Sequence, residues 1–131
     1  MVLCNDPLAT ALNTIRTHEK AGKRECEIKP VSKFVKEVLL LFQKNNYIGD
    51  FEFVDVGPEG HFKVALLGNI NDTNVIKPRF SVKKAEWGKW EQRFIPSKDF
   101  GILIVSTPYG LMTNADAKKR GTGGKLIAYV Y

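Results

Sequence analysis

The stretch from residue 101 to residue 131 constrains the fold more than any other part of the chain. Residues 102–105 form an uninterrupted run of branched apolar side chains, and such runs fill strands that are buried on both faces. The run breaks abruptly into residues 106–110, a polar segment that contains two hydroxyls, a proline and a hinge glycine. The sequence therefore predicts a buried strand that holds a rigid polar loop at its end.

The residues after this loop predict a short helix and a final strand. Thr113 and Asp116 stand at the Thr-x-x-Asp spacing, which approximates a capping box and satisfies free amides at a helix start. The glycine-rich residues 121–124 end this helix and lead into a strand over residues 125–131. The arrangement suits the presentation of hydroxyls and backbone groups to a ligand, but it is poor in catalytic residue types.

The N-terminal half opens with a predicted helix that has Pro7 in its first turn and Asn5 or Asp6 as its cap. Apolar residues recur at helical spacing until Gly22 ends the element. Residues 25–30 alternate between polar and apolar side chains, which predicts a short strand.

A second helix is expected after Ser32, which caps it. Its apolar face is broad, and Leu40 extends that face nearly all round, so this helix is the expected packing centre of the N-terminal half. Residues 51–56 and 62–67 then predict two antiparallel strands joined by a turn at residues 57–60.

An internal boundary is expected at residues 68–74, where Asn, Asp and Gly dominate and no periodicity survives. We therefore expect an N-terminal α+β domain over residues 1–74 and a C-terminal β-rich domain over residues 75–131. The predicted fold class is α+β with two small subdomains. The first has the order αβαββ, and the second is mainly antiparallel β with short helices.

Two further elements are predicted in the C-terminal half. Residues 76–82 look extended, and Pro78 restricts them to an edge or irregular strand. A helix over residues 86–95 places Trp87 and Trp90 on one face. Tryptophans among lysines could stack on bases, but aromatics at helical spacing more often cover a core, so core packing is the preferred interpretation.

The charge of the chain suggests a polyanionic partner. Its formal net charge is +6 and its pI is about 9.4. Residues 20–36 carry a local balance of +4 and residues 77–98 one of +5, whereas residues 50–59 hold four acids and no base. An ordinary solvated surface could explain any one of these clusters. The separation of the signs favours one face that meets phosphate and another that does not.

Several classes of protein are not expected. No apolar run approaches the 18 or so residues of a membrane helix, and the N-terminus lacks a charged region followed by a secretory core. Cys4 and Cys26 lack CxxC spacing, so free thiols are preferred over a disulfide or over a zinc site with His18 and His61. No metal, cofactor or catalytic residue is therefore assigned.

A phosphate-binding P-loop at residues 121–125 is also rejected. That motif needs a glycine where Lys119 stands and a Ser or Thr where Leu126 stands. Its loop must also run from a strand into a helix, whereas this one is expected to run from a helix into a strand.

RNA binding fits the two C-terminal loops better. Structured RNA exposes a shallow minor groove with 2′-hydroxyls, and short, fixed groups such as those of Ser106 and Thr107 can read it. Pro108 reduces the entropy lost on ordering, and Tyr109 can stack on a base. The glycines in 121–124 remove side-chain bulk near a phosphate. The alternative is that the first loop is only a connector and the second only a helix stop. The basic residues Lys118, Lys119 and Arg120 could bind phosphate, or could simply complement a helix dipole.

The same residues carry a family resemblance. Ser-Thr-Pro-Tyr-Gly at residues 106–110, Ala-Asp-Ala-Lys-Lys-Arg-Gly-Thr-Gly-Gly-Lys at 115–125 and Ala-Tyr-Val-Tyr at 128–131 resemble the C-terminal signature of the eighth protein of the small ribosomal subunit. The segments at residues 5–9, 29–33, 46–50 and 76–80 resemble the same family. The bacterial form usually has Ser-Lys at positions 108 and 109 and an acid at position 125, so this chain looks like the archaeal and eukaryotic branch.

The resemblance implies an α+β RNA-binding protein that is a monomer when isolated and works in the cytoplasmic ribosome. It implies direct binding to the central domain of small-subunit ribosomal RNA, contacts with neighbouring ribosomal proteins, and a role in assembly of the platform. It implies no catalysis, cofactor or membrane. The RNA-facing residues carried over by motif are Ser106, Thr107, Pro108, Tyr109, Gly110, Gly123, Gly124 and Lys125, with Asp6, Pro7, Lys29, Ser32 and Lys33 as a second region. The rival hypothesis is a small enzyme or regulator that binds an anionic ligand through the 106–125 loops.

Overall fold

A computed structural model of the chain describes residues 7–29, 31–55, 60–96 and 100–131. These residues form four helices and two antiparallel sheets, which confirms the α+β class. The chain divides into two compact units, Met1–Asn71 and Asp72–Tyr131. The expected helix cap at Asn5 or Asp6, the thiol of Cys4 and residues 57–59 of the expected turn lie outside the described residues.

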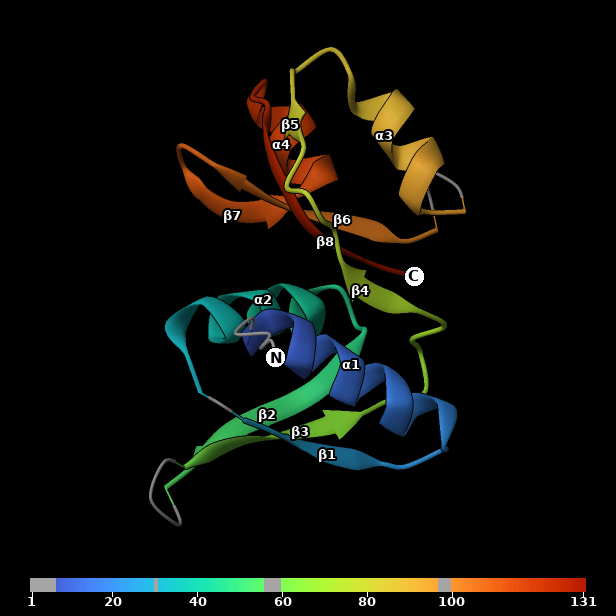
Figure 1. Ribbon diagram of the computed structural model, residues 1–131, viewed down its shortest axis with the longest axis vertical. Helices are drawn as coiled ribbons and strands as arrows, with labels where there is room; N and C mark the ends of the chain where they lie inside the picture. Colours follow the sequence, from blue (N-terminus) through green and yellow to red (C-terminus); the bar gives the residue numbers. More distant parts are fainter. Residues whose placement is uncertain (1–6, 30, 56–59, 97–99) are drawn as a thin grey trace. The chain divides into compact units, whose positions relative to one another are not determined.

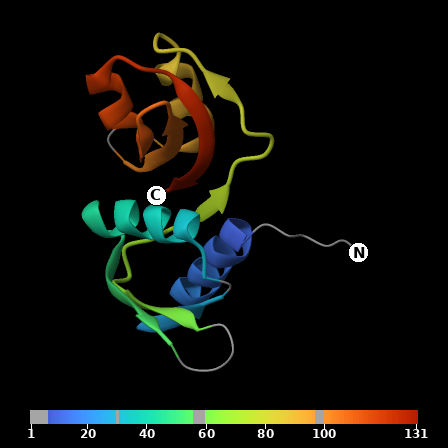
Figure 2. The ribbon, with the colours of Figure 1, turned by 90° about the vertical axis from the view of Figure 1, so that its left-hand side faces the viewer.

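The first unit has the predicted order αβαββ. Its elements are α1 (Pro7–Lys20), β1 (Glu25–Ile28), α2 (Lys33–Lys44), β2 (Ile48–Val54) and β3 (His61–Leu66). The three strands form an antiparallel sheet in the order β1-β3-β2. Both helices lie on one face of this sheet (Figures 1 and 2). Alternate residues of β3 are buried against them, as the period of a half-buried strand requires.

The start of α2 is capped as predicted. The Ser32 hydroxyl accepts a hydrogen bond from the Val35 N–H at 3.1 Å. The helix buries Val35, Val38, Leu39 and Phe42. The prediction that Leu40 extends the apolar face round the helix is wrong, because this side chain is 47% exposed. Leu40 lies one residue beyond Leu39, about 100° around the helix, and this turns it away from the core.

The second unit consists of β4 (Thr73–Val75), β5 (Ser81–Val82), α3 (Trp87–Phe94), β6 (Ile102–Thr107), β7 (Gly110–Thr113), α4 (Asn114–Arg120) and β8 (Gly124–Val130). Its five-stranded sheet has the order β4-β8-β6-β7, and β5 also pairs with β8 (Figure 1). Leu103, Ile104 and Val105 on β6 are fully buried, which confirms the strand predicted to be buried on both faces.

The core of this unit explains the two tryptophans. Trp87 is 3% exposed and Trp90 is 7% exposed, and both belong to the cluster that includes Leu103, Val105 and Leu126. Core packing, the preferred interpretation of the tryptophan spacing, is confirmed.

The segment 76–82 is irregular, as Pro78 led us to expect, and its regular part is short. Only Ser81–Val82 of the segment 76–82 pairs as a strand. The rest follows β8 irregularly through single backbone bonds, from Ile76 N–H to the Ile127 carbonyl and from Leu126 N–H to the Phe80 carbonyl. Pro78 lacks the N–H that a regular ladder needs.

One prediction for this unit needs correction: the sequence predicts a loop at residues 106–110 that leads into a helix. They form a β-hairpin instead: Ser106 and Thr107 end β6, and Gly110 begins β7. Gly110 has φ +111°, in the region where glycine is favoured. The four-residue strand β7 ends at Thr113. The hydroxyl of this residue accepts a hydrogen bond from the Asp116 N–H and caps α4 as predicted.

Candidate nucleic-acid interface

The two loops singled out in the sequence line one concavity of the second unit. Its volume is about 540 Å³. The lining residues come from β5, the β6–β7 hairpin, the loop after α4 and the start of β8, and they are Ser81, Val82, Ser106, Thr107, Pro108, Thr122, Gly123, Gly124 and Lys125. Tyr109 and Gly110 belong to the same hairpin but do not line the concavity.

Strand pairing brings these loops together. Ser106 on β6 stands opposite Lys125 on β8, and Val82 on β5 stands opposite Gly124. The end of β6, the start of β8 and the short β5 therefore meet at one end of the sheet. The buried part of β6 fixes this end of the sheet relative to the core.

The glycines of the second loop serve a purpose that the sequence did not indicate. A Cβ atom at Gly124 would lie 2.5 Å from the Ser106 carbonyl oxygen, and one at Gly123 would clash with the Val82 carbonyl. The missing side chains thus allow three backbone segments to approach one another. Close packing of the protein, rather than space for RNA, requires glycine at both positions.

The Thr107 hydroxyl is engaged within the hairpin turn. It donates to the Gly110 carbonyl at 2.9 Å and accepts from the Tyr109 N–H at 3.1 Å. A hydroxyl has one donor and two acceptor positions, so one lone pair of Thr107 is left to meet a ligand. Thr107 shapes the turn first, and Ser106 beside it is the stronger candidate for a hydroxyl that donates to RNA.

Tyr109 projects from the tip of the hairpin and is 60% exposed. The guanidinium carbon of Arg120, at the end of α4, lies 4.1 Å from the centre of its ring. This is close enough for a cation–π contact, which links the C-terminus of α4 to the hairpin. An aromatic ring held by an arginine on one side is suited to stacking on an unpaired base.

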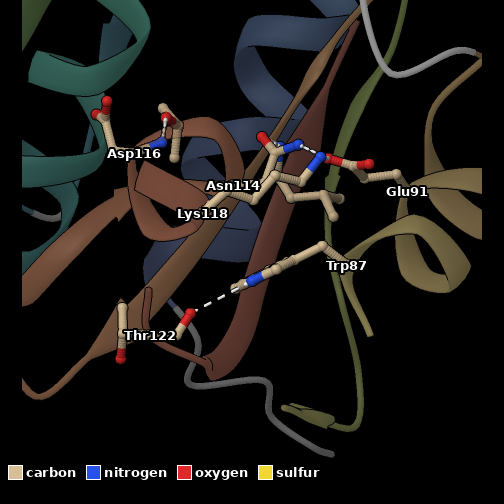
Figure 3. A network of polar contacts seen from close by, with 8 residues as sticks. Trp87, Glu91, Asn114, Asp116, Lys118 and Thr122 are labelled. Carbon is tan, nitrogen blue, oxygen red and sulfur yellow. Dashed lines mark hydrogen bonds and ion pairs between the residues drawn. The ribbon is translucent and has the colours of Figure 1, made fainter. Parts of the chain in front are cut away.

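Lys118 has a different role from the two basic residues that follow it. Its ammonium forms an ion pair with the Glu91 carboxylate at 2.5 Å, and the Glu91 side chain is only 4% exposed. The Asn114 side-chain amide donates to the same carboxylate (Figure 3). Lys118 therefore compensates the buried charge of Glu91 although its own side chain is 40% exposed, and Lys119 and Arg120 beside it are also exposed.

Sequence reasoning missed Glu91. Its position four residues after Trp87, on the face that α3 turns to the core, is the signal that could have revealed it. An acid on the buried face of a helix requires a partner, and α4 supplies two. Asn114 also accepts from the Leu103 N–H at 3.1 Å through its carbonyl oxygen, so the network ties α3 and α4 to β6.

The second region carried over by motif lies in the first unit. Pro7 is the first residue of α1 and is half-buried, Lys29 is exposed after β1, and Lys33 is exposed at the first position of α2. The Ser32 hydroxyl accepts the capping hydrogen bond from the Val35 N–H. Asp6 lies outside the described residues. Ser32 and Lys33 line a concavity of about 530 Å³ together with Val31, Lys36, Phe53 and Phe62.

The chemistry of the remaining groups does not resemble an active site. Burial raises the pKa of the Cys26 thiol to about 11, with the nearby carboxylates of Glu19 and Glu25 as smaller causes, so this thiol stays protonated at neutral pH. Within the described part of the chain, no three His, Cys, Asp or Glu side chains gather in a way that could hold a metal ion. The glycine loop runs from α4 into β8, and this confirms the rejection of a P-loop.

None of the helices in the described ranges is both long enough and apolar enough to cross a bilayer. A protein-family model described as "Ribosomal protein S8" matches the chain over residues 6–131. All of the residues carried over by motif fall within this range.

Proposed function

Because this chain belongs to the ribosomal protein S8 family, we propose that it binds directly to the central domain of small-subunit ribosomal RNA and helps to assemble the platform of that subunit. Members of the family are structural ribosomal proteins and not enzymes, and their partners are ribosomal RNA and other ribosomal proteins. The alternative of a small enzyme is therefore abandoned. The proposal includes a cytoplasmic ribosome and a protein that is monomeric when isolated.

One observation carries the proposal: the pairing of β6 with β8 brings the hairpin and the glycine loop to a single concavity. The wide minor groove of an RNA helix is shallow and lined with 2′-hydroxyls. A rigid end of the sheet that presents the Ser106 hydroxyl, one lone pair of Thr107 and backbone groups is suited to such a surface. Because these groups are fixed before binding, little conformational entropy is lost on association.

The charges around the concavity support the same proposal. Lys125 lines it and is exposed, and Lys83 and Lys84 follow directly after the lining residue Val82 and are also exposed. Lysines at the rim of a polar surface neutralise phosphates and make binding depend on salt. Of the three basic residues at the end of α4, we assign Lys119 and Arg120 to phosphate, and we assign Lys118 to the ion pair with Glu91.

We further propose that Tyr109 stacks on an exposed base or covers a sugar, and that Lys29 and Lys33 meet RNA in a second region with Asp6, Pro7 and Ser32. In this second region the lysines act as point charges, and the Ser32 hydroxyl, which accepts from the Val35 N–H, keeps its own proton for donation.

The experiment is chemical footprinting of small-subunit ribosomal RNA with and without the protein. Protections confined to a helical segment of the central domain are expected. Protection spread evenly over the RNA, or no protection, would refute the proposal. Ser106→Ala should reduce the protections. Asn71→Ala is the control, because it changes an exposed residue at the end of the other unit, and it should leave the protections unchanged.

A further inference from the structure

Trp87 is buried in the core, yet its indole nitrogen reaches the loop that lines the concavity. The Nε1–H group donates to the Thr122 carbonyl at 3.3 Å (Figure 3). Thr122 is also held by its own N–H, which donates to the Ala117 carbonyl at 3.0 Å. The peptide group that joins Thr122 to Gly123 therefore has its carbonyl fixed on the side of the core.

The planarity of that peptide group determines the direction in which the Gly123 N–H points. In a trans peptide the C=O and the following N–H lie in one plane and point in opposite directions. With the Thr122 carbonyl aimed at Trp87, the Gly123 N–H is aimed away from the core. Gly123 lines the concavity, and among the described residues its N–H has no hydrogen-bond acceptor.

A side chain at position 123 would not leave this geometry intact, because its Cβ would clash with the Val82 carbonyl. The peptide group is thus held by the Trp87 hydrogen bond on one side and lies close to the Val82 carbonyl of β5 on the other. A free, oriented backbone donor at a polar concavity beside Lys125 is suited to an acceptor oxygen that carries negative charge or a lone pair.

We propose that Trp87 is a positioning residue for RNA binding, and that it orients the Gly123 N–H to donate to an acceptor oxygen of the RNA sugar–phosphate backbone. This inference rests on the proposed function. It adds a residue from α3 that does not touch RNA and a specific protein atom that does.

The test compares two substitutions of the same kind on the same helix. Trp87→Phe removes the N–H donor and keeps an aromatic ring. Trp90→Phe makes the same change three residues away, where the indole nitrogen is buried without a partner in the described part of the protein. Affinity is measured with a transcript of small-subunit ribosomal RNA at fixed salt, and stability is measured by urea unfolding.

Trp87→Phe is expected to lower affinity about five- to tenfold, the scale of one hydrogen bond, and to leave the dependence on salt unchanged. Trp90→Phe is expected to bind like the wild type. Equal losses in both variants would overturn the inference, because they would indicate a general effect of core packing. No loss in either would overturn it as well.

Replacing Trp87 with β-(3-benzothienyl)alanine covers the case in which Trp87→Phe does not fold. Sulfur takes the place of the N–H in a ring of almost the same shape, so the same loss of affinity is expected without a change in packing. Wild-type affinity from this variant would contradict the role of the N–H.

Modified RNA identifies the acceptor. Single methylphosphonate and 2′-deoxy substitutions are placed through the nucleotides protected in footprinting. At one position in the RNA, a substitution should lower the affinity of the wild-type protein and should not lower the affinity of Trp87→Phe any further. A methylphosphonate with this behaviour assigns a phosphate oxygen, and a 2′-deoxy nucleotide assigns a 2′-hydroxyl. If every substitution weakens both proteins equally, the hydrogen bond from Gly123 does not exist. Failure of the wild-type protein to prefer ribosomal RNA would instead count against the proposed function itself.

Discussion

Single residues of the candidate interface divide into those free to meet RNA and those that hold the protein together. Ser106 and Lys125 line the concavity with groups that RNA can use, whereas the hydroxyls of Thr107, Thr113 and Ser32 make hydrogen bonds within the chain. This division leads to different predictions for neighbouring positions.

Ser106→Ala should weaken binding to small-subunit ribosomal RNA by about 1–1.5 kcal/mol, the cost of one lost hydrogen bond, and should leave the free energy of unfolding nearly unchanged. Thr107→Val should instead destabilise the protein by about 1 kcal/mol, because it removes both turn hydrogen bonds. Thr107→Ser keeps the hydroxyl and is the matched control. RNA titration and urea unfolding distinguish these effects, and a destabilised Ser106→Ala would show that its hydroxyl is structural.

Lys118→Ala and Lys119→Ala should differ although the residues are adjacent. Removing Lys118 leaves the buried Glu91 carboxylate with Asn114 alone, and we expect a loss of about 2–3 kcal/mol, below the usual cost of breaking a fully buried pair because Lys118 is partly exposed. Lys119→Ala should leave stability unchanged and reduce the slope of log affinity against log salt by about one. Similar stability of the two variants would contradict the structural role assigned to the ion pair between Lys118 and Glu91.

Cys26 should make stability depend on pH in the alkaline range. Its pKa is raised from 9.0 to about 11 by burial first and by Glu19 and Glu25 second, so the folded state holds the thiol proton more tightly than the unfolded state. The resulting contribution to stability is present below pH 9 and is lost as the pH rises towards 11. Cys26→Ala should therefore lose less stability than the wild type between these pH values in urea unfolding. If the free energy of unfolding changed with pH in the same way in both proteins, the raised pKa of Cys26 would be contradicted.

At the scale of elements, the meeting of β5, β6 and β8 determines whether the concavity exists. Gly124→Ala places a Cβ 2.5 Å from the Ser106 carbonyl, so it should separate β8 from β6 and lower both stability and RNA affinity. Gly121→Ala meets no atom within 4 Å, but it puts a side chain on a residue with φ +71°. It should cost about 1 kcal/mol of stability and little affinity once folded. Equal affinities of the two variants would show that strand approach does not shape the site.

Periodicity and turn residues were enough to predict most elements. The buried strand β6, the Ser32 cap of α2 and the end of α4 at Gly121 each have a strong local cause. The strand β7 was missed because Gly-Leu-Met-Thr is short and has little β-branching, and its pairing with β6 is what makes it a strand.

The candidate site was predictable only in part, for a similar reason. The composition of the two loops indicated RNA, but their meeting at one concavity depends on the pairing of Ser106 with Lys125 across the sheet. The role of Lys118 depends on Glu91, 27 positions earlier in the sequence. Contacts between residues that are so far apart along the chain leave no local pattern in the sequence.

For the whole molecule, acidic and basic residues are unevenly distributed along the chain. Asp50 and Glu52 are exposed on β2, while Lys83, Lys84 and Lys125 lie at or beside the concavity of the second unit. Such a distribution attracts RNA from a distance and leaves its recognition to short-range groups.

The central claim is that this protein recognises a particular RNA structure and does not merely bind polyanions. The most direct measurement is its affinity, at physiological salt, for a transcript of the central domain of small-subunit ribosomal RNA and for a scrambled transcript of equal length. We predict that the first binds at least about tenfold more tightly, a difference of about 1.4 kcal/mol or more, and that Ser106→Ala narrows this difference. Equal binding of the two transcripts would contradict the account.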